Sequence, residues 1–435
     1  MYNKVRPLSE IAYHSRPFST ILQYTGTLGV SFVTLVFNAF ELIIISRFLG
    51  AEGRGFLSAI TVLPSLASQI VEWGQLKTIT RAVGNSIFPE RAVLRYIVFF
   101  SVAGGSLGAA ACLFLMSLIL RNSSYKLTTE FAASLVIPCY IGFQMIRGYL
   151  LGKNNIFHYN LITLFNIVVL TTGTLLSVFI FASPEAVLWS RVVSSTITVV
   201  LGLYIGNRLI EYKTFQYSSI SPKYVLSNGA LYTFGMIAIA ALFRLDVLVV
   251  SAFSSTQEVG IYANGLVVPE VLKSLASALG VIIMARSANM AGDRRNFLKS
   301  PDARLMSWIV PTLAVTGSLA VYVMSDLLVT VAFGQSFLES AAITRIVLPG
   351  TALISCALVV QLYYDGLGRP FVTISCFGLS AIFECIADLI VVPRYGIVGA
   401  AYVCSLSYLL CSLVIIVLFI IEHRVWSQRA PRPVH

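Results

Sequence analysis

The sequence has few charged residues: 11% of its 435 residues are Asp, Glu, Lys or Arg, whereas 57% are hydrophobic. Ordinary soluble domains carry about 25% charged residues. A soluble fold also lacks the interior needed to bury this much apolar surface. The composition therefore excludes a soluble enzyme, a secreted domain and a disordered chain. It indicates a protein whose solvent is mostly lipid.

The usual patterns of disulfide and metal chemistry are missing. The seven cysteines all lie in apolar segments, and none belongs to a CxxC pair. The four histidines lie in the tails or near a loop, so they form no metal cluster. We predict neither a disulfide framework nor a metal or cofactor site. The first residues lack the apolar core of a signal peptide, so we expect no cleaved leader.

Enzyme motifs are also missing. No Walker A sequence occurs, because Gly152-Lys153 lacks the upstream glycine and the following Ser or Thr. Residues 104–108 match the GxSxG pattern of hydrolases, but they lie in an apolar run and no histidine lies in any span. That stretch is more typical of a small-residue face that packs against another helix. We therefore expect no catalytic activity.

Twelve apolar runs have the length of about 17–25 residues that crosses a bilayer. They predict an all-α polytopic membrane protein. The runs cover residues 24–46, 55–73, 96–120, 131–151, 161–182, 187–206, 229–252, 261–284, 308–332, 341–364, 371–392 and 397–421.

The net charge of +11 is distributed unevenly between the predicted loops. With the N-terminus inside, 20 of the Lys and Arg residues fall on the cytoplasmic side and 5 on the opposite side. Such an asymmetry over short loops predicts that both termini are cytoplasmic. It also explains the basic balance without nucleic acid, for which no loop is long enough to form a binding module.

The two halves of the chain repeat each other. A shift of 205 residues places Phe48 on Phe253, Gly55 on Gly260, Pro64 on Pro269, and Glu41 on Asp246. We predict two six-helix lobes related by a pseudo-two-fold axis along the membrane normal, with residues 1–206 in the first lobe and 229–435 in the second. We expect residues 207–228 to form a cytoplasmic linker. Transporters of this plan hold their substrate near the midplane between the halves.

Several motifs resemble those of the polysaccharide (O-antigen) flippases of the multidrug/oligosaccharidyl-lipid/polysaccharide exporter superfamily. They are "SRFLGAEGRGF" after the first span, "RLDVLVVSAFSSTQEVGIY" in the seventh, "VTVAFGQSFLESA" after the ninth, and "GLGRP" and "IVVPRYGIVGAAYV" between the tenth and twelfth. The resemblance covers nearly the whole chain. The first half departs from it at residues 183–186, where the second half has a Tyr-Gly-Ile-Val-Gly hairpin.

The resemblance implies a secondary transporter of the bacterial inner membrane. It would flip an undecaprenyl-pyrophosphate-linked oligosaccharide from the inner to the outer leaflet by alternating access, for O-antigen (lipopolysaccharide), capsule or exopolysaccharide assembly. Implied partners are this polyprenyl-pyrophosphate-linked glycan, membrane lipid, H⁺ or Na⁺, a glycan polymerase and a chain-length regulator. A drug/cation antiporter and a lipid II flippase of the same superfamily are alternatives. A membrane glycan polymerase or ligase is an alternative of another class, against which the lack of a large outer loop counts.

Charges inside the predicted spans are the candidate site residues, because intramembrane charges usually face the interior of a bundle. Arg244 and Lys273 lie deepest. The other three lie about one turn from a span end, where snorkelling to the headgroups is the alternative. The candidate substrate-binding residues are Arg244, Lys273, Arg147, Arg191 and Arg345.

Glu41 and Asp246 are the candidate ion-coupling residues, because the repeat places them at equivalent depths. The alternative for Glu41 is an ion pair with Arg345 or Arg191. Glu270 and Lys273, three residues apart on one helix, can pair with each other. Arg244 and Asp246 are two residues apart and point to different faces, so Arg244 has no obvious partner. Glu384 and Asp388 share a face of the eleventh span and repel each other, which suits either ion coupling or a wet vestibule.

Overall fold

A computed structural model describes residues 17–119, 126–210, 222–289 and 308–428 of the chain. These residues fold almost entirely into helices, without a strand among them. The helices of the first half are α1 (Pro17–Glu72), α2 (Gln75–Gly84), α3 (Glu90–Ile119), α4 (Leu127–Gly152), α5 (Ile156–Leu176) with the π-helical turn η2 (Ser177–Phe181), and α6 (Pro184–Arg208). Those of the second half are α7 (Pro222–Phe253), α8 (Thr256–Gly265), α9 (Val267–Asn289), α12 (Val310–Phe333), the short η4 (Gln335–Phe337), α13 (Leu338–Gly366) and α14 (Pro370–Gln428).

Within the described residues, nine helices are long and apolar enough to cross a membrane. This confirms the prediction of an all-α membrane protein. Two of the nine each join two predicted spans: α1 holds the first and second, and α14 holds the eleventh and twelfth. The number of twelve separate crossings and the two-lobe division stay predictions.

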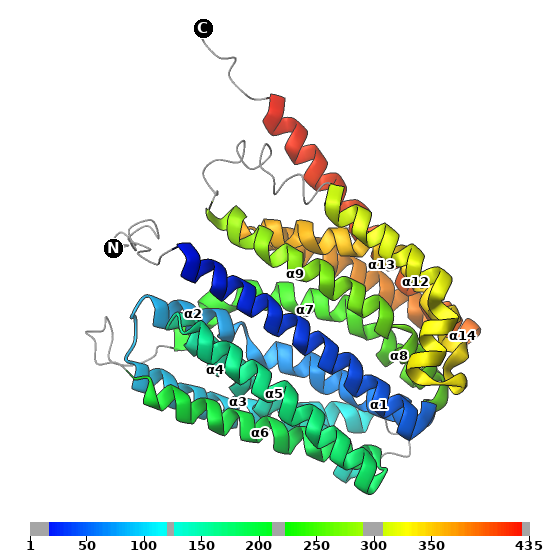
Figure 1. The fold of residues 1–435 in the computed structure, drawn as a ribbon, viewed down its shortest axis with the longest axis horizontal. Coiled ribbons are helices and arrows are strands. Elements are labelled where there is room, and N and C mark those ends of the chain that lie inside the picture. Colours follow the sequence, from blue (N-terminus) through cyan, green and yellow to red (C-terminus); the bar gives the residue numbers. More distant parts are fainter. Residues whose placement is uncertain (1–16, 120–125, 211–221, 290–307, 429–435) are drawn as a thin grey trace.

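Glycines interrupt α1 and α14 at the points where the sequence predicts hairpins. Gly50 has φ 68° and Gly396 has φ 58°, in the left-handed region that glycine adopts without a steric penalty. At each, the helical path breaks and the chain reverses direction (Figure 1). Both turns lie at the end of the bundle opposite the start of α1 and the end of α14, which we call the Gly50 end; the other end is the terminal end.

The buried apolar side chains form two clusters. One draws almost entirely on α1 to α6 and includes Ile45, Leu57 and Tyr149. The other draws on α7 to α14 with a few residues of α1, and includes Leu242 and Tyr408. In Figure 1, α1 runs between the group formed by α2 to α6 and the group formed by α7 to α14. α1 therefore contributes to both cores, which places any cavity between the groups next to it.

Candidate functional site

A cavity of about 430 Å³ lies between the two groups of helices. Its wall is formed by the second leg of α1 together with parts of α4, α6, α7, α8 and α9. The volume falls within the range of about 300–1,000 Å³ that is typical of ligand pockets. We call it the central cavity.

A row of polar side chains from α1 lines one side of the central cavity. Ser58, Thr61, Ser65 and Ser68 follow one another at the three- and four-residue spacing that places side chains on a single helix face, and Gln69 lies four residues after Ser65. Each of the four hydroxyls donates a hydrogen bond of 2.6–2.8 Å to a carbonyl of its own helix. Their oxygens keep lone pairs that can accept hydrogen bonds from a ligand. This polar row gives the cavity a wall suited to a hydroxyl-rich molecule.

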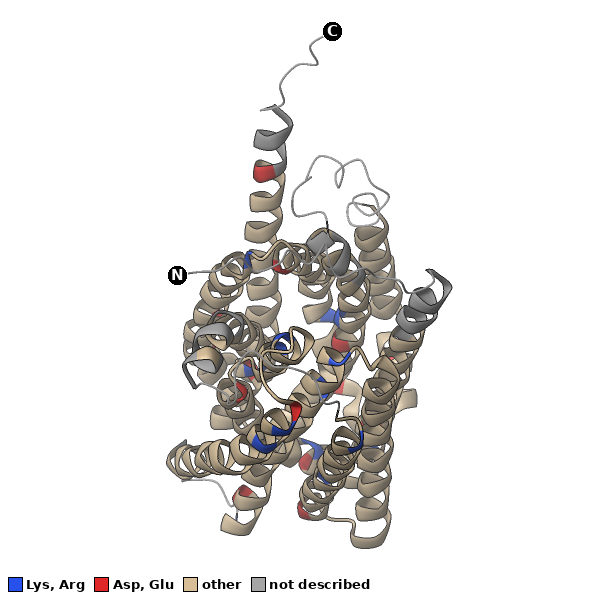
Figure 2. Cartoon of the chain, turned by 90° about the vertical axis from the view of Figure 1, so that its left-hand side faces the viewer, with Lys and Arg blue, Asp and Glu red and all other residues tan. Residues whose placement is uncertain are grey.

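Arginine dominates the charge of the cavity wall. Arg54, Arg191 and Arg244 line it from α1, α6 and α7, and Glu270 of α9 is the one acidic residue among the described residues of its lining. Arg244 Nη1 lies 3.2 Å from Glu270 Oε1, and about half of the Arg244 side chain remains exposed. Arg54 Nε donates to Asn264 Oδ1 at 2.9 Å. The end-on view of Figure 2 shows basic and acidic positions lying among the helices. The cavity wall thus carries an excess of positive charge.

Glu41 is buried in α1 and forms an ion pair with Arg191, one of the arginines that line the central cavity. Arg191 Nη2 lies 2.8 Å from Glu41 Oε1, and the hydroxyl of Thr174 donates to the same oxygen at 3.1 Å. Pairing with Arg191 was one alternative predicted for Glu41, and the structure contains this pair. The carboxylate therefore orients Arg191 and offsets part of its charge.

A second polar cluster lies inside the helices of the second half. Asp246 accepts hydrogen bonds of 2.7 Å from the hydroxyl of Tyr262 and from the backbone N–H of Val247. A carboxylate oxygen each of Asp246 and Glu384 and the Sγ of Cys404 lie within 4.8 Å of one another. We call Asp246, Glu384 and Asp388 the buried acids.

Two of the buried acids have no bonded partner in the part of the chain that the structure describes. Glu384 and Asp388 are completely buried, and none of their four carboxylate oxygens accepts a hydrogen bond there. An unpaired buried carboxylate is costly unless it is protonated or meets a cation. Carboxylate oxygens are the ligands that hard cations prefer. These groups could hold a proton or a small hard cation.

Lys273 lies in an aromatic niche and not in the cavity wall. Its Nζ donates to the hydroxyl of Tyr408 at 3.0 Å and lies 4.2 Å from the centre of the Phe243 ring. Glu270 forms its ion pair with Arg244 on another helix, whereas the sequence offered Lys273 on its own helix as one alternative partner. The same contact corrects the expectation that Arg244 lacks a partner.

The two remaining candidate arginines lie outside the central cavity. Arg147 of α4 donates to Gln144 Oε1 at 2.9 Å and stacks on the ring of Tyr159. Arg345 of α13 pairs with Asp326 at 2.6 Å, where the side chains are 34% and 58% exposed. Neither residue is part of the cavity lining. The structure thus brings together Arg191 and Arg244 of the five candidates, and it places Glu41 and Asp246 in separate clusters.

Sequence reasoning missed Arg54 and the polar row of α1. Arg54 lies between the first and second predicted spans, as a loop residue would, but the turn at Gly50 returns the chain into the bundle within four residues. The signal for the polar row is present in the sequence: hydroxyl residues at helical spacing inside an otherwise apolar span.

Contacts between the two halves close the Gly50 end. The Ser46 hydroxyl and Arg54 both donate to Asn264 Oδ1, at 3.0 and 2.9 Å. Arg47 Nε donates to the carbonyl of Ala332 at 2.8 Å. At the terminal end, a Cβ on Gly229 of α7 would lie 2.1 Å from the carbonyl oxygen of Trp73, so these two backbones also touch. The cavity therefore lies between contacts at both ends.

Comparisons with known proteins give the fold a name. The sequence matches no family model. It is 20% identical over 253 residues to an uncharacterized membrane protein of Methanocaldococcus jannaschii, a match that covers 54% of this chain and 49% of that protein. The chain thus spans about half the length of the curated relative it matches.

Solved structures match over most of the chain. A lipid II flippase MurJ in an inward closed conformation gives a TM-score of 0.73 at 13% identity, covering 92% of this chain and 87% of the other. An inward-facing MATE multidrug transporter of the MOP superfamily gives 0.70 at 11% identity, covering 94% and 100%. A Pyrococcus furiosus MOP transporter, described as having a binding pocket of reverse polarity, gives 0.64 at 11%, covering 96% and 98%. The chain has the fold of MOP-superfamily transporters.

Proposed function

We propose that the protein is a secondary transporter that flips a polyprenyl-pyrophosphate-linked oligosaccharide across the membrane by alternating access. The observation that carries the proposal is the wall of the central cavity, where Arg54, Arg191 and Arg244 face Glu270 as the one acidic residue of the described lining. The fold shared with flippases and transporters supports a transport role.

The arginines suit a pyrophosphate group. A guanidinium forms two parallel hydrogen bonds to phosphate oxygens, and such charge-assisted bonds are among the strongest in proteins. Arg244 keeps about half of its side chain exposed despite its pair with Glu270, so it retains donors for a ligand. Arg54 and Arg191 approach from two other helices. A phosphate between them would be neutralised from three directions.

The polar row of α1 suits the glycan. Sugar hydroxyls donate to the lone pairs that Ser58, Thr61 and Ser65 leave open toward the cavity. Tyr140 adds an aromatic face from α4. The polyprenyl chain stays in the bilayer, because its apolar surface gains nothing from entering a polar cavity. No bond of the substrate is made or broken in this step.

In this proposal, the buried acids bind the coupling ion. Asp246 and Glu384 lie close together, and Asp388 is buried one helical turn beyond Glu384 on α14. A buried carboxylate needs a proton or a cation to offset its charge. A proton or Na⁺ bound there in one access state and released in the other would link the motion of the halves to an ion gradient. Glu41, bonded to Arg191, acts as a positioning residue for the cavity arginine.

Export of a cationic drug is the second candidate function, and the buried acids favour it. They offer negative charge inside the membrane, and MATE multidrug transporters share the fold. The two functions differ in the charge of the ligand that enters the central cavity.

Binding to the purified protein separates them. Undecaprenyl-pyrophosphate-linked oligosaccharide should raise the unfolding temperature of the wild type in detergent and should do so less for Arg244→Gln. Arg345→Gln, whose arginine lies outside the cavity, is the matched control. A lipophilic cation such as tetraphenylphosphonium should leave the unfolding temperature unchanged. Stabilisation by the cation and not by the glycolipid would replace the flippase proposal by drug export.

A further inference from the structure

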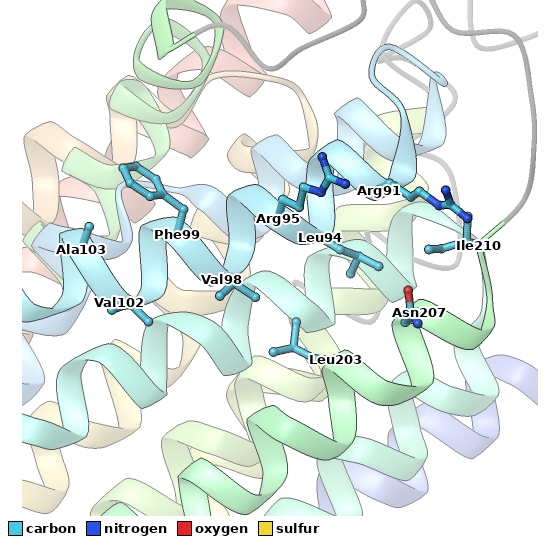
Figure 3. A pocket seen from close by; sticks show the side chains of 10 residues that line it. All are labelled: Arg91, Leu94, Arg95, Val98, Phe99, Val102, Ala103, Leu203, Asn207 and Ile210. Carbon is cyan, nitrogen blue, oxygen red and sulfur yellow. The ribbon is translucent and has the colours of Figure 1, made fainter.

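A groove of about 920 Å³ runs along the outside of the first half, between α3 and α6 near the terminal end (Figure 3). Both helices pack against α4, and the groove lies where they flank each other. It shares no lining residue with the central cavity. The groove is therefore a separate feature, which transport through the cavity does not explain.

The floor and walls of the groove are apolar over most of its length. Val98, Phe99, Val102 and Ala103 of α3 line it, opposite Leu203 of α6. Phe99 is 68% exposed and Val102 is 62% exposed, although both lie in a helix apolar enough to span the membrane. Apolar side chains exposed on such a helix face acyl chains. The lining thus suits a hydrocarbon chain that lies along the helices.

Cationic and polar groups gather at one end of the groove. Arg91 and Arg95 lie one turn apart at the start of α3, and Asn207 lies at the end of α6. Figure 3 shows Arg91 at the end of the groove near Asn207 and Ile210, Arg95 one turn farther along α3, and Phe99 and Val102 beyond it. No acidic residue is among the described residues of the lining. Glu90, which precedes Arg91, is bonded to Lys153 at 2.8 Å on the buried side of α3.

The spacing of these features matches one leaflet of a bilayer. Arg95 and Ala103 are eight residues apart, which corresponds to about 12 Å along a helix. One leaflet of the hydrocarbon core is about 15 Å thick, half of the full core. Because the arginines lie in the first turns of a spanning helix, they lie at the depth of the headgroups when the apolar part lies among the acyl chains.

From this arrangement we infer that the groove binds an anionic glycerophospholipid of the surrounding leaflet. Its phosphate lies against Arg91, Arg95 and the amide of Asn207. One acyl chain fills the apolar groove between α3 and α6. The bound lipid completes the packing of this face and stabilises the first half of the protein. Each arginine near the membrane surface is worth about 1 kcal/mol, or about fivefold in affinity for the anionic lipid.

Lipid retention by the purified full-length protein tests the inference. Native mass spectrometry in detergent counts bound dioleoyl phosphatidylglycerol and dioleoyl phosphatidylcholine at equal concentrations. The wild type should retain the anionic lipid in preference. Arg91→Gln with Arg95→Gln should reduce this preference by about fivefold for each arginine. Arg208→Gln is the matched control, because Arg208 is exposed on α6 at the same end but bonded to Tyr204 outside the groove.

A second pair of variants tests the groove itself. Val102→Trp should fill the groove and reduce retention of both lipids. Leu107→Trp, at a position on α3 that is 74% exposed and outside the lining, should not. The unfolding temperature in lipid-free detergent should be the same for all variants, and phosphatidylglycerol should raise it least for the double Gln variant. Equal retention of both lipids by the wild type, or a preference that survives the double substitution, would overturn the inference.

Two competition arms identify the occupant. Inorganic phosphate at the lipid concentration should displace none of the phosphatidylglycerol, since it lacks the acyl chain. Undecaprenyl phosphate should also fail to displace it, because its methyl-branched chain packs less closely than a straight acyl chain between α3 and α6. Displacement by phosphate would make the site a free-anion site, and displacement by undecaprenyl phosphate would assign it to the transported class of lipid. Either result overturns the assignment to a structural phospholipid and leaves the proposed function of the central cavity untouched.

Discussion

Gly55 of α1 and Gly260 of α8 pack directly against each other at the Gly50 end. A Cβ on Gly55 would lie 1.7 Å from the carbonyl oxygen of Thr256 and 2.7 Å from the amide nitrogen of Gly260. A Cβ on Gly260 would lie 1.9 Å from the carbonyl oxygen of Ala51. The same two glycines occupy equivalent positions of the internal repeat. Under alternating access, this contact must separate whenever the cavity opens at that end.

Gly55→Val should therefore prevent closure at the Gly50 end. Overpacking costs about 1–3 kcal/mol in a well-packed core, and here the neighbouring atoms are backbone and cannot turn away. Spin labels at Glu52 and Gln257, which are exposed and equivalent in the repeat, should report a longer distance in the variant. Gly29→Val, where a Cβ meets nothing within 4 Å, is the control on the same helix. An unchanged distance between the two spin labels in Gly55→Val would refute the view that the contact between Gly55 and Gly260 closes the cavity at the Gly50 end.

The pair between Glu41 and Arg191 should contribute to stability. Breaking a fully buried pair costs about 3–5 kcal/mol, and because 22% of the Arg191 side chain is exposed we expect about 1–3 kcal/mol for Glu41→Gln. Thermal unfolding in detergent measures this, and the double variant with Arg191→Gln should recover part of the loss. Arg345→Gln breaks an exposed pair and should cost less than about 1 kcal/mol. If Glu41→Gln were as stable as the wild type and transport lost its ion dependence, Glu41 would be an ion-coupling residue instead.

Neutralising the buried acids should uncouple transport from the ion gradient. Asp246→Asn, Glu384→Gln and Asp388→Asn keep the size of each side chain and remove its ability to bind a proton or Na⁺ as a carboxylate. In liposomes, the combined variant should move substrate at one rate with and without an imposed gradient. Asp326→Asn changes an acid that is 58% exposed and should keep the wild-type response. Gradient dependence that persists in the combined variant would exclude these acids as the coupling site.

The charge asymmetry predicts the orientation of the chain. Reporter fusions after residues 85, 215, 295 and 430 should report the cytoplasm, and fusions after 125 and 257 the opposite side, because short loops rich in Lys and Arg stay inside. Alkaline phosphatase and green fluorescent protein serve as complementary reporters at each position. A signal from the opposite side at residue 215 would contradict the division into two six-helix halves.

The helices were predictable because lipid imposes a simple rule. A span must be apolar over about 20 residues, so hydropathy alone places most of the helices. The residues of the site were harder to predict, because contacts across helices decide which charges meet. Arg244 pairs with Glu270, which lies on another helix, and Glu384 meets Asp246 from α14. The repeat predicted equivalent positions for Gly55 and Gly260, but it carried no information that these positions touch.

The direction of the chain after Gly50 explains why the sequence did not identify Arg54 as a site residue. Hydropathy shows where an apolar run begins, and Arg54 lies just before the second run. The positive φ of Gly50 turns α1 back into the bundle, and the arginine then points at Asn264 and the central cavity. A turn of this kind is a local backbone property, whereas the place of Arg54 depends on α8 lying opposite.

The most direct test of the proposed function is flipping in proteoliposomes. A fluorescent undecaprenyl-pyrophosphate-linked oligosaccharide is followed by its protection from a membrane-impermeant quencher, with an ion gradient imposed. The wild type should move it faster than protein-free liposomes do. Arg54→Gln and Arg244→Gln should each slow it about 10- to 100-fold, as expected for the loss of a charge-assisted hydrogen bond of about 1.5–3 kcal/mol, and Arg244→Lys should recover part of the rate. Arg345→Gln should match the wild type. A wild-type rate equal to that of protein-free liposomes, or wild-type rates in both cavity variants, would contradict the account.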